Sequence, residues 1–212
     1  RDPVLGVGAL HEVYSRQRPT YTGRLTVPLL WDRVAGTAVS NESAEIVRML
    51  GAFGGPDLYP ADLADRIDAW NDLIHPGLNN GVYRAGFART QEAYDTAVRE
   101  VFATLDRIEA QMAQTRYLTG DRFTEADLRL FPTLARFDVA YHSAFKCNLR
   151  RLIDYPNLWA FAREIYQMPG IAGTVDFDVY RRGYHSPSPL RNPLGIVPIG
   201  PEIDWSAPHG RG

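Results

Sequence analysis

Cysteine is almost absent from this sequence, because Cys147 is the one cysteine among 212 residues. A single thiol cannot form an intrachain disulfide, and it cannot provide the cysteine pair of a common zinc site. The sequence also has no run of about 18 apolar residues, the length that a helix needs to cross a bilayer. Since its first 30 residues lack the basic, apolar and small-residue order of a signal peptide, we expect a cytoplasmic protein without a membrane partner.

The sequence also lacks a large excess of positive or negative charge. Lysine and arginine total 23 against 25 aspartates and glutamates, so the net charge is -2 at pH 7 and nucleic acid is not an expected partner. The histidines show no metal-ligand spacing with acidic neighbours, which predicts that the chain holds no metal. The hydrophobic share of 45% instead indicates a folded globular protein.

Residues 1–55 predict part of a sheet domain. The expected elements are a short helix within 11–21 that stops near Pro19, strands at 25–31 and 37–39 that form a hairpin, and a helix that is capped by Ser40 or Asn41 and ends near residue 54. Two strands rarely form a stable sheet alone. We therefore expect that another copy of the chain or a further segment covers this hairpin.

Residues 61–212 predict an all-helical domain with a tail rich in proline and glycine. The expected helices lie at 61–74, 91–112, from 124 onward and at 157–167, with a break at 75–77. Thr124 and Asp127 have the spacing of a capping box, which opens a helix. The predicted fold class is α+β to mainly α, and the tail is expected to be ordered only if it packs back onto the helices.

Val27 and Pro28 form a candidate binding element together with a polar pair at a helix start. Pro28 cannot donate within a strand ladder, so it must lie at an edge, at a bulge or after a cis peptide bond. If that bond is cis, the Val27 main chain is turned outward and can pair with an extended peptide. Glu42 can accept hydrogen bonds from an ammonium group, while Ser43 and the helix N-terminal amides favour a carboxylate. These groups suit the α-amino acid end of a peptide such as glutathione, although the same residues could simply decorate a helix N-terminus.

Two sets of segments carry a resemblance to a known family. TVPLLWD at 26–32 and NESAEI at 41–46 resemble the glutathione-binding part of thioredoxin-like transferase domains, and LTG at 118–120 with TEAD at 124–127 resembles their helical domain. More specific segments are similar to glutathionyl-hydroquinone reductases: NNGVY at 79–83, RFD at 136–138, FKC at 145–147, YQMPGI at 166–171, and the tail from NP at 192–193 to HGR at 209–211. The resemblance spans nearly the whole chain.

The resemblance implies the C-terminal part of a thioredoxin-like domain at 1–55, followed by a helical domain at 61–212 through which two copies form a homodimer. In that family a cysteine thiolate takes the glutathionyl group from a glutathionyl-hydroquinone, and a second glutathione releases it as the disulfide. Glutathione is then the expected co-substrate, contacted by Val27, Pro28, Glu42 and Ser43. Tyr83 and Tyr184 match tyrosines of the hydroquinone pocket, where a phenol can bond the substrate hydroxyl. Each tyrosine could equally be a half-buried packing residue.

The family's nucleophile belongs to a Cys-Pro-Trp segment, which this sequence does not contain. We expect that segment upstream of Arg1, where the chain opens without a methionine, and we expect the chain alone to be inactive. Cys147 matches a noncatalytic position and is interpreted as a structural thiol. Two alternatives stay open: a glutathione-binding and dimerisation module without catalysis, and a transferase that conjugates glutathione to electrophiles.

Overall fold

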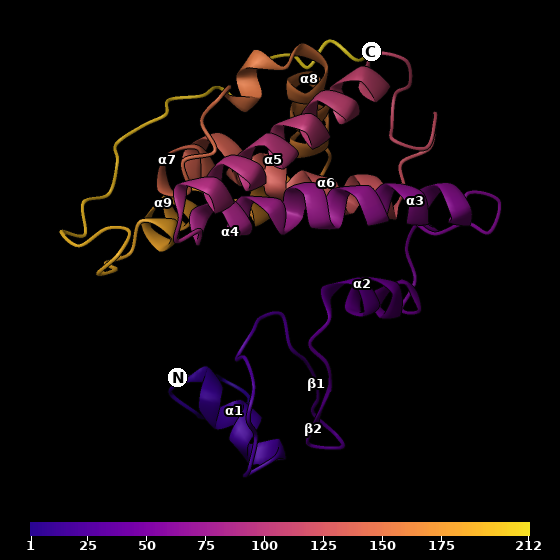
Figure 1. Cartoon of the computed structure of the whole chain (residues 1–212). Helices are drawn as coiled ribbons and strands as arrows, with labels where there is room; N and C mark the ends of the chain where they lie inside the picture. The colour runs from indigo at the N-terminus through magenta and orange to yellow at the C-terminus, as the bar shows by residue number, and fades with distance from the viewer. The chain divides into compact units, whose positions relative to one another are not determined.

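The computed structural model describes residues 1–212 and divides into two compact units, Arg1–Asp57 and Leu58–Gly212 (Figure 1). All β-strands belong to the first unit, and the second unit is helical. The predicted fold class, a small β-hairpin unit followed by an all-helical one, is confirmed.

The N-terminal unit contains two helices and one antiparallel hairpin: α1 (Leu10–Gln17), β1 (Leu30–Asp32), β2 (Thr37–Ser40) and α2 (Ser43–Gly51). Asp32 shapes the turn of the hairpin, because its carboxylate accepts hydrogen bonds from the main-chain N–H groups of Val34 and Ala35 at 2.8 and 2.9 Å. Gly36 completes the turn with a φ of 65°, which favours glycine. The buried apolar side chains of this unit are few: Val7, Val13, Tyr14 and Ile46.

The first strand is shorter than the sequence predicts. It begins at Leu30 rather than at residue 25, so Pro28 lies outside the hydrogen-bonded ladder. A ladder cannot run through a proline in mid-strand because proline has no N–H to donate. Of the three placements expected for Pro28, the structure shows the cis Val27-Pro28 peptide bond.

The helical unit begins with a nearly continuous helical run: α3 (Ala64–Ile74), the π-helical turn η1 (His75–Asn79) and α4 (Gly81–Gly86). The predicted end of the helix at residue 74 is confirmed, but the predicted break at residues 75–77 is a π-helical turn and not an interruption of the winding. Pro76 has no N–H to donate to an α3 carbonyl, and the chain passes this position in a π-helical turn. The N–H of Asn80 bonds to the His75 carbonyl at 2.8 Å, so the chain winds on past the proline.

The long helix α5 (Gln91–Met112) has the predicted bounds, and its apolar stripe is buried as expected. Thr90 caps it by accepting a hydrogen bond from the Ala93 N–H at 3.2 Å. The remaining elements are α6 (Glu125–Arg136), η2 (Phe137–Tyr141), α7 (His142–Ala144), η3 (Leu152–Asp154), α8 (Pro156–Tyr166), η4 (Ala172–Thr174) and α9 (Phe177–Tyr184). None of these helices is both long enough and apolar enough to cross a membrane.

The predicted capping box at the start of α6 is confirmed. The Asp127 carboxylate accepts hydrogen bonds from the Thr124 N–H at 2.9 Å and from the Thr124 hydroxyl at 3.0 Å. It also accepts one from the Leu118 N–H at 2.9 Å, which ties the preceding turn to the helix. Asp127 is fully buried, so this cap is part of the core.

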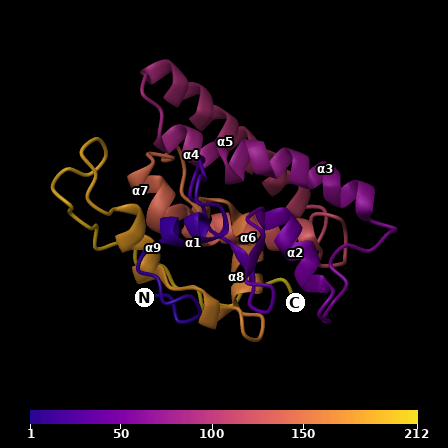
Figure 2. The same ribbon diagram turned by 90° about the horizontal axis from the view of Figure 1, so that it is seen from below.

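The C-terminal tail packs back onto α8, and its end lies beside that helix in both views (Figures 1 and 2). Trp205 is buried and its ring meets Trp159 of α8 edge to face, with 4.8 Å between the ring centroids. The buried Glu164 carboxylate accepts bonds from Arg211 at 2.6 Å and from the Tyr117 hydroxyl at 2.8 Å. The tail is ordered by these contacts, as the sequence predicts it must be.

Candidate active site

The first candidate site element is the segment around Val27 in the N-terminal unit. The Val27 side chain is 76% exposed, and no hydrogen bond within the chain uses its main-chain N–H or carbonyl. The preceding residue is held in place, because the buried Tyr14 donates its hydroxyl to the Thr26 carbonyl at 2.9 Å. A segment that is held in place and has free main-chain groups can pair with the main chain of a peptide.

The second element is the start of α2, nine residues in length, where Glu42 is the N-cap residue and Ser43 the first helical residue. Both side chains are exposed. Ser40 does not cap the helix as predicted. Its hydroxyl instead accepts a bond from the Glu42 N–H at 3.0 Å and donates to the Glu45 carboxylate at 2.8 Å. The Ser43 hydroxyl and the first amides of α2 are thus left for a ligand.

The two elements are joined by one residue. The Asn41 amide donates to the Thr26 hydroxyl at 3.2 Å and to the Tyr14 hydroxyl at 3.3 Å. Asn41 immediately precedes Glu42, and Thr26 immediately precedes Val27. The predicted glutathione contacts therefore lie on two segments that share a hydrogen-bonded link.

The helical unit holds a cluster of three tyrosines. The Tyr83 hydroxyl of α4 and the Tyr184 hydroxyl of α9 are 2.6 Å apart, so the structure brings the two predicted residues together. Tyr141 of η2 joins them, with its hydroxyl 3.1 Å from that of Tyr184. Phe145 packs against all three rings, at centroid distances of 5.2 Å from Tyr83, 5.5 Å from Tyr141 and 5.6 Å from Tyr184.

Counting hydrogens shows that this cluster keeps one donor for a ligand. Each phenol can donate once, and the two bonds among the three hydroxyls use two of the three hydrogens. Tyr141 is buried, whereas Tyr83 is half-buried. Either oxygen can be the donor in each bond, and the spare hydrogen is on the half-buried Tyr83 when Tyr141 donates to Tyr184 and Tyr184 donates to Tyr83. Donation in series also strengthens the terminal donor.

Burial keeps Tyr141 and Tyr184 protonated. Burial, together with the neighbouring Tyr184 and Tyr83, raises the pKa of Tyr141 above its usual range. Burial also raises the pKa of Tyr184 to about 12. At neutral pH these two phenols therefore keep their protons and can donate hydrogen bonds.

Cys147 is fully buried behind the cluster, and its N–H bonds to the Tyr141 carbonyl at 3.0 Å. Burial raises the pKa of its thiol to about 12, so almost no thiolate exists at neutral pH. The side chain behaves as the structural thiol that the sequence indicates. No three histidine, cysteine, aspartate or glutamate side chains gather where they could hold a metal ion.

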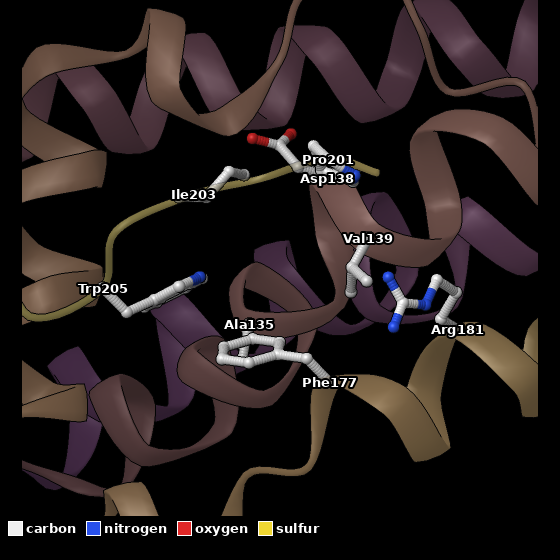
Figure 3. A pocket seen from close by; sticks show the side chains of 8 residues that line it. All are labelled: Ala135, Asp138, Val139, Phe177, Arg181, Pro201, Ile203 and Trp205. Carbon is white, nitrogen blue, oxygen red and sulfur yellow. The ribbon is translucent and has the colours of Figure 1, made fainter. Parts of the chain in front are cut away.

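A separate small cavity lies beneath the C-terminal tail (Figure 3). Its volume is about 90 Å³, and it is lined by Ala135, Asp138, Val139, Phe177, Arg181, Pro201, Ile203 and Trp205. Ligand pockets are usually at least about 300 Å³, so this cavity suits a few water molecules. Asp138 is already bonded to the Leu152 N–H at 2.6 Å, and Arg181 donates to the Ile199 carbonyl at 2.6 Å. The cavity is a packing gap under the tail.

Tyr141 is the site residue that the sequence analysis missed. It lies midway between Phe137 and Phe145, four residues from each. That spacing places the three rings on one helical face, which is typical of a core stripe. The signal was present, but a core stripe gives no indication that one ring also carries a hydroxyl into a polar cluster.

Comparison with known proteins shows to which family the chain is similar. The family model for the C-terminal domain of glutathione S-transferases matches residues 91–164. The chain is 53% identical to glutathionyl-hydroquinone reductase YqjG of Escherichia coli, over 95% of the chain and 63% of that protein. It is 47% identical to glutathionyl-hydroquinone reductase PcpF of Sphingobium chlorophenolicum, over 94% of the chain and 66% of that protein. The chain thus spans slightly less than two thirds of these relatives.

Solved structures agree with the sequence comparison. The glutathione-bound structure of YqjG from Escherichia coli has a TM-score of 0.95 and 50% identity, with 99% of this chain and 70% of that chain covered. The Xi glutathione S-transferase of Phanerochaete chrysosporium has a TM-score of 0.90 and 44% identity, with 94% and 71% covered. The chain therefore belongs to the glutathione S-transferase family, in the group that joins the Xi-class transferases with the glutathionyl-hydroquinone reductases.

Proposed function

We propose that this chain is the substrate-holding part of a glutathione-dependent reductase of glutathionyl-hydroquinones. The observation that carries the proposal is the chain of three phenols, which leaves one hydroxyl hydrogen for a ligand. A hydroquinone ring fits such a site, because it offers an oxygen to accept that hydrogen and a flat face to pack on aromatic rings. The names of the two curated relatives point to the same substrate class.

Glutathione is the proposed co-substrate, bound by the N-terminal unit. The free main-chain groups of Val27 suit the peptide part of glutathione, next to the cis bond to Pro28. Glu42 and Ser43 at the start of α2 suit its ammonium and carboxylate groups. The glutathione-bound relative supports this assignment.

The covalent step needs a thiolate, which Cys147 does not supply because its thiol is buried and protonated. We assign that thiolate to a cysteine outside this chain. In the proposed reaction it takes the glutathionyl sulfur from the hydroquinone and forms a mixed disulfide, while the ring carbon that loses sulfur gains a proton. A second glutathione then displaces the cysteine and leaves as glutathione disulfide.

The test is turnover of a glutathionyl-hydroquinone by the complete gene product. We expect hydroquinone and glutathione disulfide in equal amounts, and we expect Tyr184→Phe to lower kcat/KM by about tenfold or more because it interrupts the phenol chain. Tyr180→Phe is the matched control, since Tyr180 is also on α9 but packs against Arg136 and Phe177 instead of the cluster.

Other outcomes would identify the alternatives. Conjugation of glutathione to an electrophile without hydroquinone release would indicate a conjugating transferase. Glutathione binding without turnover of either substrate would indicate a binding module. Equal losses in Tyr184→Phe and Tyr180→Phe would remove the phenol chain from the reaction.

We also propose that the helical unit forms a homodimer. The surface between α3, η1, α4 and α5 is hollowed and carries charges of both signs, Asp72 and Glu100 with Arg84 and Arg107. Arg84 and Glu100 pair with each other within the chain at 2.6 Å, which leaves Asp72 and Arg107 to meet their opposites in a second copy across a two-fold axis. Light scattering on the complete gene product should give twice the monomer mass, and Arg107→Glu should shift it toward the monomer.

A further inference from the structure

Arg191 lies against the edge of the tyrosine cluster. Its guanidinium carbon is 4.3 Å from the centre of the Phe87 ring and 5.8 Å from that of Phe145. Both rings belong to the wall of the cluster: Phe87 is stacked on Tyr83 with 8° between the ring planes, and Phe145 meets Tyr184 edge to face. One aromatic ring therefore separates this cation from the phenols.

The loop that follows α9 can be traced in Figures 1 and 2. It carries Arg191, and hydrogen bonds tie it to the end of α9. Ser188 and Asn192 exchange two main-chain hydrogen bonds of 3.0 Å, which close the loop around Arg191. The Asn192 amide donates to the carbonyl of His185, the residue after Tyr184, and to the Ile196 carbonyl at 3.0 Å. Arg191 and Tyr184 are thus fixed to one hydrogen-bonded frame.

Arg191 differs from the arginines around it because it has no acidic partner. Arg181 and Arg182 of α9 both pair with Asp178, at 3.0 and 2.6 Å. Arg191 forms neither an ion pair nor a hydrogen bond within the chain, and it is exposed. Stacking on two rings fixes the guanidinium plane and leaves its N–H groups free for a bidentate anion.

We propose that Arg191 is a specificity-determining residue that selects aromatic substrates carrying an anionic substituent on the ring. The inference rests on the proposed function, because it assigns the substrate class of the same site. A ring held at the spare phenol donor can direct a carboxylate or sulfonate toward the free side of the guanidinium. The stacked Phe87, which is 55% exposed, extends the same apolar surface under the substrate.

A structural role is the competing explanation, in which the cation merely fastens the loop to Phe87. The two explanations predict different results for substrates that differ only in charge. A fastening role affects both substrates equally, whereas anion recognition affects the charged one alone. The discriminating pair is the glutathionyl conjugate of a hydroquinone sulfonate and that of the matching methyl sulfone, which has a similar size and no charge.

The experiment measures kcat/KM for both conjugates in the complete gene product, in Arg191→Met, and in Arg182→Met as the surface control. We expect Arg191→Met to lower the value about tenfold for the sulfonate and less than about twofold for the sulfone, with KM carrying the loss. Arg191→Lys should recover part of it, since the charge remains but the planar fork is lost. Equal losses for both conjugates, or an equal effect of Arg182→Met, would overturn the proposal.

A binding measurement separates this inference from the proposed function. Calorimetry with 2,5-dihydroxybenzenesulfonate and with the uncharged sulfone needs no turnover. Arg191-dependent binding of the sulfonate alone, with no turnover of either conjugate, would retain the anion site and reject the reductase. Turnover of both conjugates, with Arg191→Met affecting the charged and the uncharged one equally, would support the reductase and reject the anion site.

Discussion

The two units hold their candidate ligand groups by different means. The N-terminal unit has four buried apolar side chains, and it positions Val27 through side-chain bonds from Tyr14 and Asn41 to the preceding Thr26. The helical unit packs its phenols into a contiguous core in which Phe137 and Phe145 are almost completely buried. The N-terminal unit thus presents main-chain groups on a segment with a small core, whereas the helical unit presents side chains that are themselves part of its core.

This difference predicts how substitutions in each unit affect stability and ligand binding. A change in the helical core is expected to cost several kcal/mol and to disturb the phenols with it, because they share the same packing. A change in the N-terminal unit is expected to cost less free energy of unfolding but to act directly on the peptide-binding edge.

The largest effect is expected for large-to-small substitutions in the two cores. Leu105→Ala removes a side chain with no exposed surface from the centre of α5 and should lower the free energy of unfolding by about 3–4 kcal/mol. Ile46→Ala in α2 should cost about half as much, because fewer neighbours surround the space it leaves. Denaturant unfolding followed by circular dichroism measures the first, and hydrogen exchange of the α2 amides measures the second. Equal costs would remove the contrast between the units.

Asp127 gives the helical core a pH dependence. Burial raises the pKa of its carboxyl from 3.8 to about 6. The folded state therefore keeps the proton between about pH 4 and 6 while the unfolded state releases it, so the contribution of Asp127 to stability is largest below about pH 4 and falls by up to about 3 kcal/mol across this window. Asp127→Asn cannot titrate, so the gap in unfolding free energy between wild type and variant should shrink as the pH rises from 4 to 7. A constant gap would show that the capped carboxyl is ionised throughout.

The sequence predicted correctly those elements that depend on residues close together in the chain. The bounds of α5 were predicted correctly because its apolar residues recur at helical spacing along its length. Thr90, which caps the helix, immediately precedes its first residue. The capping box at Thr124 was predicted because its geometry depends on four consecutive residues. The strand before Leu30 was overextended, since β-branched residues favour a strand and nothing local shows where pairing stops.

The candidate site was predictable only where a motif carried it. Tyr83 and Tyr184 were named from a resemblance, and only the fold shows that their hydroxyls meet. The roles proposed for Tyr141 and Arg191 depend on contacts between residues that are far apart in the sequence. Tyr141 and Tyr184, for example, are separated by 43 positions. No periodicity within one segment contains that information, so these two residues had to come from the structure.

Replacing glycine by alanine should have opposite signs in the two units. A Cβ at Gly86 of α4 would lie 2.2 Å from Cγ of Phe145, so Gly86→Ala should cost about 1–3 kcal/mol and push the Phe145 ring against the phenols. Gly51→Ala in α2 meets no atom within 4 Å and should stabilise by about 0.5 kcal/mol through helix propensity. Thermal unfolding of both variants checks the signs. A neutral Gly86→Ala would mean that the aromatic cluster can shift without cost.

Replacing Tyr14 is expected to change stability only modestly, so glutathione binding is the more informative readout. Tyr14→Phe removes the hydroxyl that donates to the Thr26 carbonyl at 2.9 Å and accepts from Asn41 at 3.3 Å, so we expect a loss of about 1 kcal/mol. Because Thr26 positions Val27, the same variant should weaken glutathione binding about threefold, measured by calorimetry on the complete gene product. Tyr21→Phe is the matched control, since its hydroxyl also bonds to a main-chain carbonyl, that of Arg24 at 2.9 Å, but outside the link to Val27. Equal weakening in both variants would mean that the whole segment is loosely held, and that the N-terminal unit binds its peptide without the frame that Tyr14 and Asn41 provide.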